Sequence, residues 1–177
     1  MCQFRLTGKK VGILAEKYYE TLELWYPYYR FKEEGAEVVV IGSGSAPRFE
    51  CKHGYPVEVD VDAGNIKAED LDGIIIPGGW APDHLRRYPE VVNLVKECFE
   101  AGKVVAAICH AGSVLVSAQV LQGRTVTSFM AIKDDMINAG ANFVDQEVVR
   151  DGNLITSRTP KDLPAFCREM ISALAGS

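Results

Sequence analysis

The sequence predicts an α/β protein with a doubly wound, mostly parallel sheet that carries helices on both faces. Short apolar runs without alternation are typical of buried parallel strands. Four such runs lie at residues 11–15, 37–41, 73–76 and 104–108. Three strand–helix units precede the last of these runs, and repeated units of this kind build parallel sheets.

A helical pattern follows most of the predicted strands, and a further helix is predicted at the C-terminal end of the sequence. We expect the first helix over residues 20–34, ended by Gly35, with an inward apolar stripe formed by Leu22, Trp25, Tyr26, Tyr29 and Phe31. Further helices are predicted at residues 89–101, 110–121 and 133–139. Asp162 is the expected N-cap of the last helix, with Pro164 in its first turn.

The remaining segments read as hairpins and turns. Residues 49–52 and 57–61 flank a turn and predict an antiparallel hairpin that stands off the main sheet. A second hairpin is predicted from residues 144–150 and 154–157 around Asp151-Gly152-Asn153. The chain shows no internal repeat or linker, so we expect one domain over residues 1–177.

Composition narrows the possible functions. The 177 residues are 47% hydrophobic and 24% charged with a net charge of −5, as in ordinary soluble proteins. The acidic balance and the lack of basic clusters argue against nucleic acid and membrane partners. Five scattered cysteines form no C-x-x-C pair, which favours reduced thiols, a cytoplasmic location and no bound metal. No signal peptide or membrane-spanning run is apparent.

The clearest candidate for chemistry is Cys109. It directly follows the apolar run 104–108 and precedes a helical segment, so it should lie at the carboxyl edge of the sheet, where α/β proteins bind ligands. A helix N-terminus favours the thiolate form of a cysteine. Buried cysteines are, however, often simply core residues.

Polar or flexible groups at other strand ends should approach Cys109. Glu20 begins the helix after the first strand, Gly78-Gly79 follows the third strand, and His110 is adjacent to the cysteine itself. Glycines at such an edge expose N–H groups that can form an oxyanion hole, although they often only make a turn. Glu20 is alternatively an acid favoured by the helix dipole alone.

Three motifs resemble the PfpI family of intracellular cysteine peptidases and stress proteins. They are Ala-Ile-Cys-His-Ala-Gly at 107–112, Ile-Pro-Gly-Gly-x-Ala-Pro-Asp at 76–83, and Ser-Arg-Thr-Pro-x-Asp-Leu-Pro-Ala-Phe at 157–166. The similarity extends over nearly the whole chain. It implies relationship to the parkinsonism-associated deglycase and a flavodoxin-like, class I glutamine amidotransferase-like fold.

The resemblance also implies roles for individual residues. Cys109 matches the nucleophile, and Glu20 matches a protonated acid that is hydrogen-bonded to its sulfur. His110 matches the histidine after the nucleophile. Asp83 matches an acid that reaches that histidine across a subunit interface. The N–H groups of Gly79 and His110 match the oxyanion hole.

This chain departs from the peptidase pattern at three positions. Asp83 stands where the peptidases have glutamate, Phe129 replaces a tyrosine beside the site, and Ala111 replaces the glycine after Cys-His. No His-x-Glu pair follows the nucleophile, so the glutamine amidotransferase triad is missing.

We therefore expect a cofactor-free enzyme whose cysteine acts on α-oxoaldehydes or early glycation adducts, as a glyoxalase or protein deglycase does. One alternative is a PfpI-type peptidase that uses Cys109, His110 and Asp83. Another is a non-catalytic redox sensor or chaperone that works through oxidation of Cys109. The expected partners are small carbonyl compounds, or glycated or peptide substrates. The resemblance further implies a homodimer or homohexamer.

Overall fold

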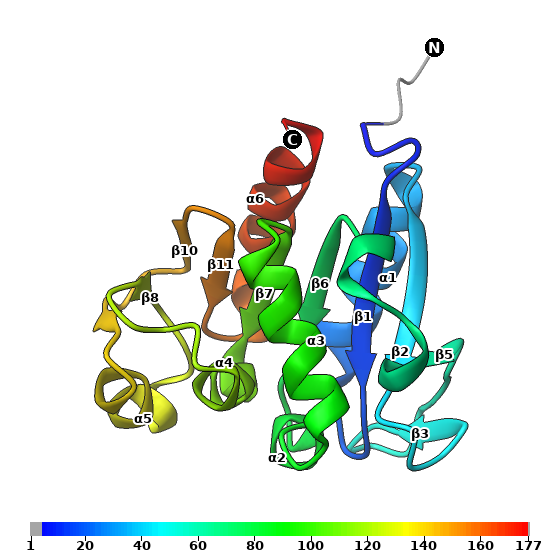
Figure 1. Cartoon of the computed structure of the whole chain (residues 1–177), viewed down its shortest axis with the longest axis horizontal. Coiled ribbons are helices and arrows are strands. Elements are labelled where there is room, and N and C mark those ends of the chain that lie inside the picture. Colours follow the sequence, from blue (N-terminus) through cyan, green and yellow to red (C-terminus); the bar gives the residue numbers. More distant parts are fainter. Residues whose placement is uncertain (1–4, 177) are drawn as a thin grey trace.

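A seven-stranded sheet forms the centre of the computed structural model, which describes residues 5–176 (Figure 1). The strand order is β10-β11-β7-β6-β1-β2-β5. All neighbouring pairs are parallel except β10–β11, so the predicted mostly parallel sheet is confirmed. The strands are β1 (Lys10–Ala15), β2 (Glu37–Gly42), β5 (Val61–Asp62), β6 (Gly73–Ile76), β7 (Val104–Ile108), β10 (Val148–Asp151) and β11 (Leu154–Ser157).

Helices cover both faces of this sheet, as expected for a doubly wound fold. On one face α1 (Thr21–Glu33) packs against α6 (Leu163–Ala175), and on the other α3 (Pro89–Glu100) packs against α4 (Gly112–Ala118) (Figure 1). Two short helices, α2 (Ala81–Leu85) and α5 (Lys133–Asn138), complete the set. Within residues 5–176 no helix is both long and apolar enough to cross a membrane.

The apolar runs are buried because helices enclose the sheet on both sides. Every residue of β6, β7 and β11 is buried, which is the reason that these strands lack the alternation of a half-exposed strand. The predicted inner face of α6 is also confirmed, since Leu163, Phe166, Met170 and Ile171 are buried. This core fixes the carboxyl ends of β1, β6 and β7 beside one another.

The hairpins differ in detail from the prediction. Strand β3 (Arg48–Glu50) pairs with β4 (Pro56–Glu58) as an antiparallel hairpin outside the main sheet, as expected. Its second arm is shorter than predicted, because Val61 leaves the hairpin and joins the edge of the main sheet beside β2. The hairpin β10–β11 is confirmed, with β10 beginning at Val148. Strands β8 (Thr125–Val126) and β9 (Asn142–Phe143) pair with each other in a separate small sheet.

The predicted inward stripe of α1 is confirmed only for Phe31, which is buried, and for Trp25, which packs against the core. Leu22, Tyr26 and Tyr29 are exposed, and the side chains that α1 buries are Glu23, Leu24, Pro27 and Phe31. Glu23, Pro27 and Phe31 lie four residues apart and therefore share one face of the helix. The inward face thus includes a carboxyl group, whereas several aromatic side chains face outward.

The burial of α6 gives a direct test of the core. We expect Met170→Ala to lower the free energy of unfolding by about 2–5 kcal/mol, because it leaves a cavity under a helix. Met170 is 1% exposed, whereas Met130 is 52% exposed and offers a matched control. Met130→Ala should change the free energy by less than about 1 kcal/mol. Urea denaturation of both variants measures the difference, and equal losses would contradict this assignment of the core.

Candidate active site

Cys109 lies at a strained turn between β7 and α4. The buried strand ends at Ile108, and a single 3-10 turn (Cys109–Ala111) leads into the helix. Cys109 has φ +62°, in the left-handed region that costs a non-glycine residue about 1–3 kcal/mol. The Phe129 N–H donates to the Cys109 carbonyl at 3.2 Å and holds this turn in place. A sharp strand-to-helix turn of this kind is typical of nucleophiles in α/β enzymes.

Two loops meet beside Cys109 at the carboxyl edge. Backbone hydrogen bonds join the loop between β1 and α1 to the loop after β6. The Trp80 N–H donates to the Tyr18 carbonyl at 2.9 Å, and the Glu20 N–H donates to the Gly78 carbonyl at 3.1 Å. Tyr19 and Gly79 form an isolated β-bridge at the same place. These contacts bring the start of α1 to the cysteine, as predicted from the strand ends.

The acid beside the thiol is Glu23, not Glu20. Glu23 is completely buried in the first turn of α1, and its carboxyl forms a hydrogen bond with the Cys109 thiol. Its Oε2 atom accepts a hydrogen bond from Gly78 N–H at 2.7 Å. The other oxygen, Oε1, has no hydrogen-bond partner among the described N and O donors. A buried oxygen without a donor costs less when the carboxyl group carries a proton.

Glu20 occupies a different position from the one that the resemblance implied. Its side chain forms an ion pair with Lys52 from the turn of the β3–β4 hairpin. Glu20 is the N-cap of α1 and has an extended backbone, with φ −73° and ψ 121°, so its side chain does not follow the helical face that directs Glu23 into the protein. Glu20 still lines the cavity that contains Cys109, together with Lys52.

Glu23 and Cys109 strongly affect each other's ionisation. Burial raises the pKa of Glu23 from 4.5 to about 7, and the hydrogen bond from Gly78 opposes the shift. Burial, followed by the charge of Glu23, raises the pKa of the Cys109 thiol to about 12. Backbone N–H groups at the turn favour the thiolate, but burial and the charge of Glu23 outweigh them. The pair instead consists of a thiol and a carboxyl group that is half ionised near neutral pH.

The two predicted oxyanion-hole groups both reach the nucleophile. The backbone N–H groups of His110 and Gly79 donate hydrogen bonds to the Cys109 sulfur and lower its pKa. Gly79 has φ +76°, and an added Cβ atom would lie 2.5 Å from Glu20 N and 2.6 Å from Tyr18 O. Glycine is therefore required at residue 79 for its N–H to point at the sulfur.

The His110 side chain lines the cavity and is not hydrogen-bonded to Cys109. Burial lowers the pKa of His110, Asp83 opposes this effect and Lys52 adds to it. The imidazole ring lies 5.0 Å from the Phe129 ring, measured between centroids. A neutral imidazole at this position can accept or relay a proton at neutral pH.

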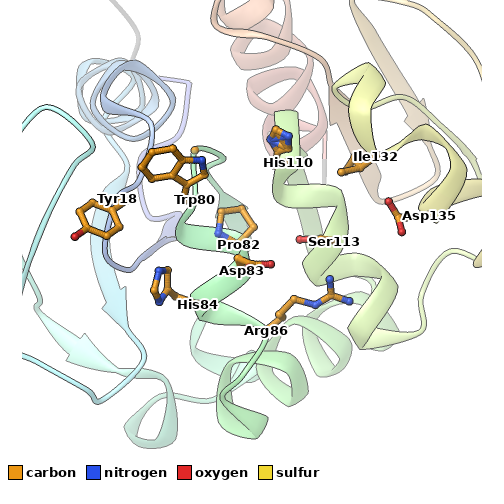
Figure 2. A pocket seen from close by; sticks show the side chains of 11 residues that line it. Tyr18, Trp80, Pro82, Asp83, His84, Arg86, His110, Ser113, Ile132 and Asp135 are labelled. Carbon is orange, nitrogen blue, oxygen red and sulfur yellow. The ribbon is translucent and has the colours of Figure 1, made fainter.

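Asp83 and His110 face the same space without touching. Both line a cavity of about 530 Å³ in which α2 and the start of α4 form opposite walls (Figure 2). Within the chain, Asp83 is largely exposed and forms a 3.5 Å ion pair with Arg87. The role of Asp83 across a subunit interface stays a prediction.

Cys109 itself opens into a smaller cavity of about 290 Å³. Glu23, Cys109 and Gly79 lie on its wall, and Thr159 and Pro160 close it from the loop before α6. Gly79, Trp80 and His110 line both cavities, so the two spaces adjoin. Among residues 5–176, no three His, Cys, Asp or Glu side chains come together as metal ligands. The arrangement suits nucleophilic addition to a small carbonyl group, assisted by one acid.

Comparisons with known proteins identify the family of this chain. The profile of the DJ-1/PfpI family matches residues 9–173. This chain belongs to the DJ-1/PfpI family. Among its relatives, a protein from Pyrococcus horikoshii named a deglycase is 47% identical over 165 residues, which cover 93% of this chain and 99% of the relative. YraA of Bacillus subtilis, named a putative cysteine protease, is 39% identical over 167 residues, which cover 94% of this chain and 99% of YraA.

A solved structure from Anabaena variabilis shows the same fold. It is a two-domain protein with DJ-1/ThiJ/PfpI-like and ferritin-like domains, 44% identical to this chain with a TM-score of 0.92. The match covers 94% of this chain and 48% of that protein, so this chain spans about half of its length. The DJ-1/PfpI architecture predicted from the sequence is thus shown.

Sequence reasoning missed two residues of this DJ-1/PfpI site, Glu23 and Lys52. The signal for Glu23 was its spacing from Pro27 and Phe31, which places a carboxyl on the face of α1 that also buries Phe31. Lys52 gave no comparable signal, because its place depends on how the hairpin docks against the start of α1.

The close contact at Gly78 predicts a sharp effect of substitution. A Cβ atom there would lie 2.6 Å from Glu23 Oε2 and 2.8 Å from Cys109 Cβ. We expect Gly78→Ala to destabilise this DJ-1/PfpI domain by about 1–3 kcal/mol. It should also speed Cys109 alkylation, because the carboxyl group that raises the pKa of the thiol is forced away from it. Gly64→Ala is the control, since its nearest neighbour would be Glu90 Cγ at 3.6 Å. Equal stability and alkylation in the two variants would contradict the packing described here.

The raised pKa of Glu23 predicts that stability depends on pH. Between pH 4.5 and about 7 the folded state keeps a proton that the unfolded state has lost, so stability falls as pH rises through this range. Glu23→Gln removes this loss while keeping an acceptor for Gly78 N–H. The free energy of unfolding of Glu23→Gln, relative to that of wild type, should therefore rise by up to about 3 kcal/mol between pH 5 and pH 8.

Urea denaturation at each pH measures this effect. Glu33→Gln on the same helix is the control, because the Glu33 side chain is 74% exposed. If the Glu23→Gln and Glu33→Gln proteins follow the same stability curve against pH, Glu23 is not the buried acid inferred here.

Proposed function

We propose that this protein is a cysteine-dependent enzyme that acts on α-oxoaldehydes and early glycation adducts. The observation that carries the proposal is the buried pair of Glu23 and Cys109, in which a carboxyl with a pKa of about 7 hydrogen-bonds a thiol. An acid–base group is most effective when its pKa lies near the working pH. The deglycase name of the relative from Pyrococcus horikoshii supports the same assignment.

The first step is addition of the thiol to the aldehyde carbon. Glu23, in its carboxylate form, accepts the thiol proton as Sγ forms a bond to carbon and the carbonyl π electrons move to oxygen. The N–H groups of Gly79 and His110 lie at the sulfur, where they are placed to stabilise the developing oxyanion. Glu23 then returns its proton to that oxygen and leaves a hemithioacetal.

The second step moves a proton between neighbouring carbons. The Glu23 carboxylate removes the proton from the carbon bonded to sulfur, the electrons of that bond form a C=C bond, and the neighbouring carbonyl becomes an enediolate oxygen. The hydroxyl proton of the hemithioacetal moves to that oxygen, the C=O bond beside sulfur forms, and the protonated acid delivers its proton to the adjacent carbon. The product is a thioester of Cys109, which water hydrolyses to a 2-hydroxy acid and the free thiol. With methylglyoxal the acid is lactate. A single buried carboxyl group suffices for both transfers, and its enclosure keeps the proton from exchanging with solvent.

The proposal is tested by methylglyoxal consumption and lactate release. We expect Cys109→Ala to abolish turnover and Glu23→Gln to reduce kcat by about 10²-fold or more, since the amide cannot carry a proton. Alkylation of Cys109 by iodoacetamide should survive in Glu23→Gln. Cys98→Ala is the matched control, because Cys98 is a free, buried cysteine on α3. Full turnover by Cys109→Ala or Glu23→Gln would refute the assignment.

Peptide hydrolysis is a second candidate, favoured by one observation. Asp83 and His110 line the larger cavity next to the nucleophile, and the charge of Asp83 raises the pKa of the imidazole. A histidine held by an acid is the usual partner of a cysteine nucleophile in peptidases. This function requires Asp83 to contact His110, either by a local shift or from a neighbouring copy of the chain.

The two activities can be separated at Asp83. If the protein is also a peptidase, Asp83→Ala should abolish hydrolysis of casein and leave methylglyoxal turnover within about twofold of wild type, because Asp83 is not needed for the aldehyde reaction. Casein cleavage that persists in Asp83→Ala but not in Cys109→Ala would exclude a Cys–His–Asp mechanism.

A further inference from the structure

The turn of the β3–β4 hairpin carries a lysine into the cysteine cavity. Lys52 lines this cavity with Cys109, and its ammonium group forms the ion pair with Glu20 described above. Its side chain is 37% exposed and that of Glu20 is 11% exposed, so the pair is partly shielded from water. Coulomb interactions are stronger in such a place than at an open surface.

The hairpin turn is fixed to the start of α1 through Cys51. The buried Cys51 sulfur accepts hydrogen bonds from the Thr21 hydroxyl at 3.0 Å, from His53 N–H at 3.3 Å and from Tyr55 N–H at 3.2 Å. Lys52 N–H also donates to the Tyr19 carbonyl at 3.3 Å. These bonds place the backbone of Lys52 next to Glu20, so that the two side chains meet.

The charges around Cys109 come from four elements. The start of α1 contributes Glu20, its N-cap, and Glu23 in its first turn. The hairpin contributes Lys52, and the turn after β7 contributes His110, on which Asp83 of α2 acts. Phe129, Thr159 and Pro160, on the remaining walls, carry no charge. Among the described residues that line this cavity, Lys52 is thus the one permanent cation.

We propose that Lys52 is a positioning residue whose ammonium charge, held in place by Glu20, stabilises the thiolate form of Cys109. The proton that leaves the thiol passes to the Glu23 carboxylate. The Cys109–Glu23 pair therefore keeps its total charge, while the negative charge moves from the carboxylate oxygen to the sulfur. Lys52 stabilises the single negative charge that Glu23 and Cys109 share, because its charge acts on both groups. Glu20 prevents the ammonium group from swinging out into solvent.

This inference deepens the proposed function but does not require turnover for its test. The rate of Cys109 alkylation by iodoacetamide, followed by peptide mass spectrometry from pH 5 to pH 10, reports the thiolate directly. We expect Lys52→Met to raise the apparent pKa of Cys109 by about one unit and to slow alkylation at neutral pH by about tenfold. Lys52→Arg should keep the wild-type profile within about threefold, since the charge is retained.

Lys67→Met is the matched control, because it removes the same charge from an exposed lysine that pairs with Glu69 at 3.5 Å. It should leave the alkylation profile unchanged. Lys52→Gln provides a second neutral variant if Lys52→Met fails to fold, as judged by circular dichroism. Wild-type alkylation profiles in both neutral variants would overturn the proposal, even if methylglyoxal turnover depends on Cys109 and Glu23.

The part played by Glu20 is tested by a double-mutant cycle. In a Glu20→Gln background, Lys52→Met should shift the alkylation pKa by less than half of its effect in the wild-type background, because the lysine is no longer held. An equal shift in both backgrounds would show that Glu20 does not position Lys52.

Discussion

The buried carboxyl of Glu23 is the point on which this active site depends. Through Oε2 it accepts the N–H of Gly78, which joins the first turn of α1 to the end of β6, and it also meets the thiol at the end of β7. One side chain therefore ties a helix and two adjacent strands together at the carboxyl edge. The missing side chain at Gly78 leaves the space that this arrangement needs.

Two glutamates three residues apart acquire different properties from their surroundings. Glu23 is enclosed by protein, and its burial raises its pKa to about 7. Glu20 lies at the rim and is matched by the charge of Lys52. Enzymes often place two carboxyl side chains in different surroundings, so that one serves as an acid–base group and the other as a fixed charge.

The sheet and the position of Cys109 at its carboxyl edge could be predicted from the sequence, whereas the acid beside the thiol was assigned to the wrong glutamate. The unbroken apolar runs identified β6 and β7, and the abrupt end of β7 identified Cys109, because both signals are local. The inner face of α1 was misassigned because tyrosines count as apolar in a periodicity argument, yet Tyr26 and Tyr29 face outward. Lys52 depends on contacts between Cys51 and Thr21, 30 residues apart, which no local pattern records.

The site draws its parts from widely separated segments, and this has a consequence for biosynthesis. These segments meet only when β1, β6 and β7 have paired and the residues before α6 have closed the cavity. The residues brought together are Glu23, Lys52, Gly79, Cys109 and Thr159. A nascent or partly folded chain carries an ordinary thiol and an ordinary carboxyl group, each exposed to water and to the cell's own electrophiles. The interacting pair of Cys109 and Glu23 thus exists only in the assembled fold, so the ionisation of this pair itself reports a completed native structure.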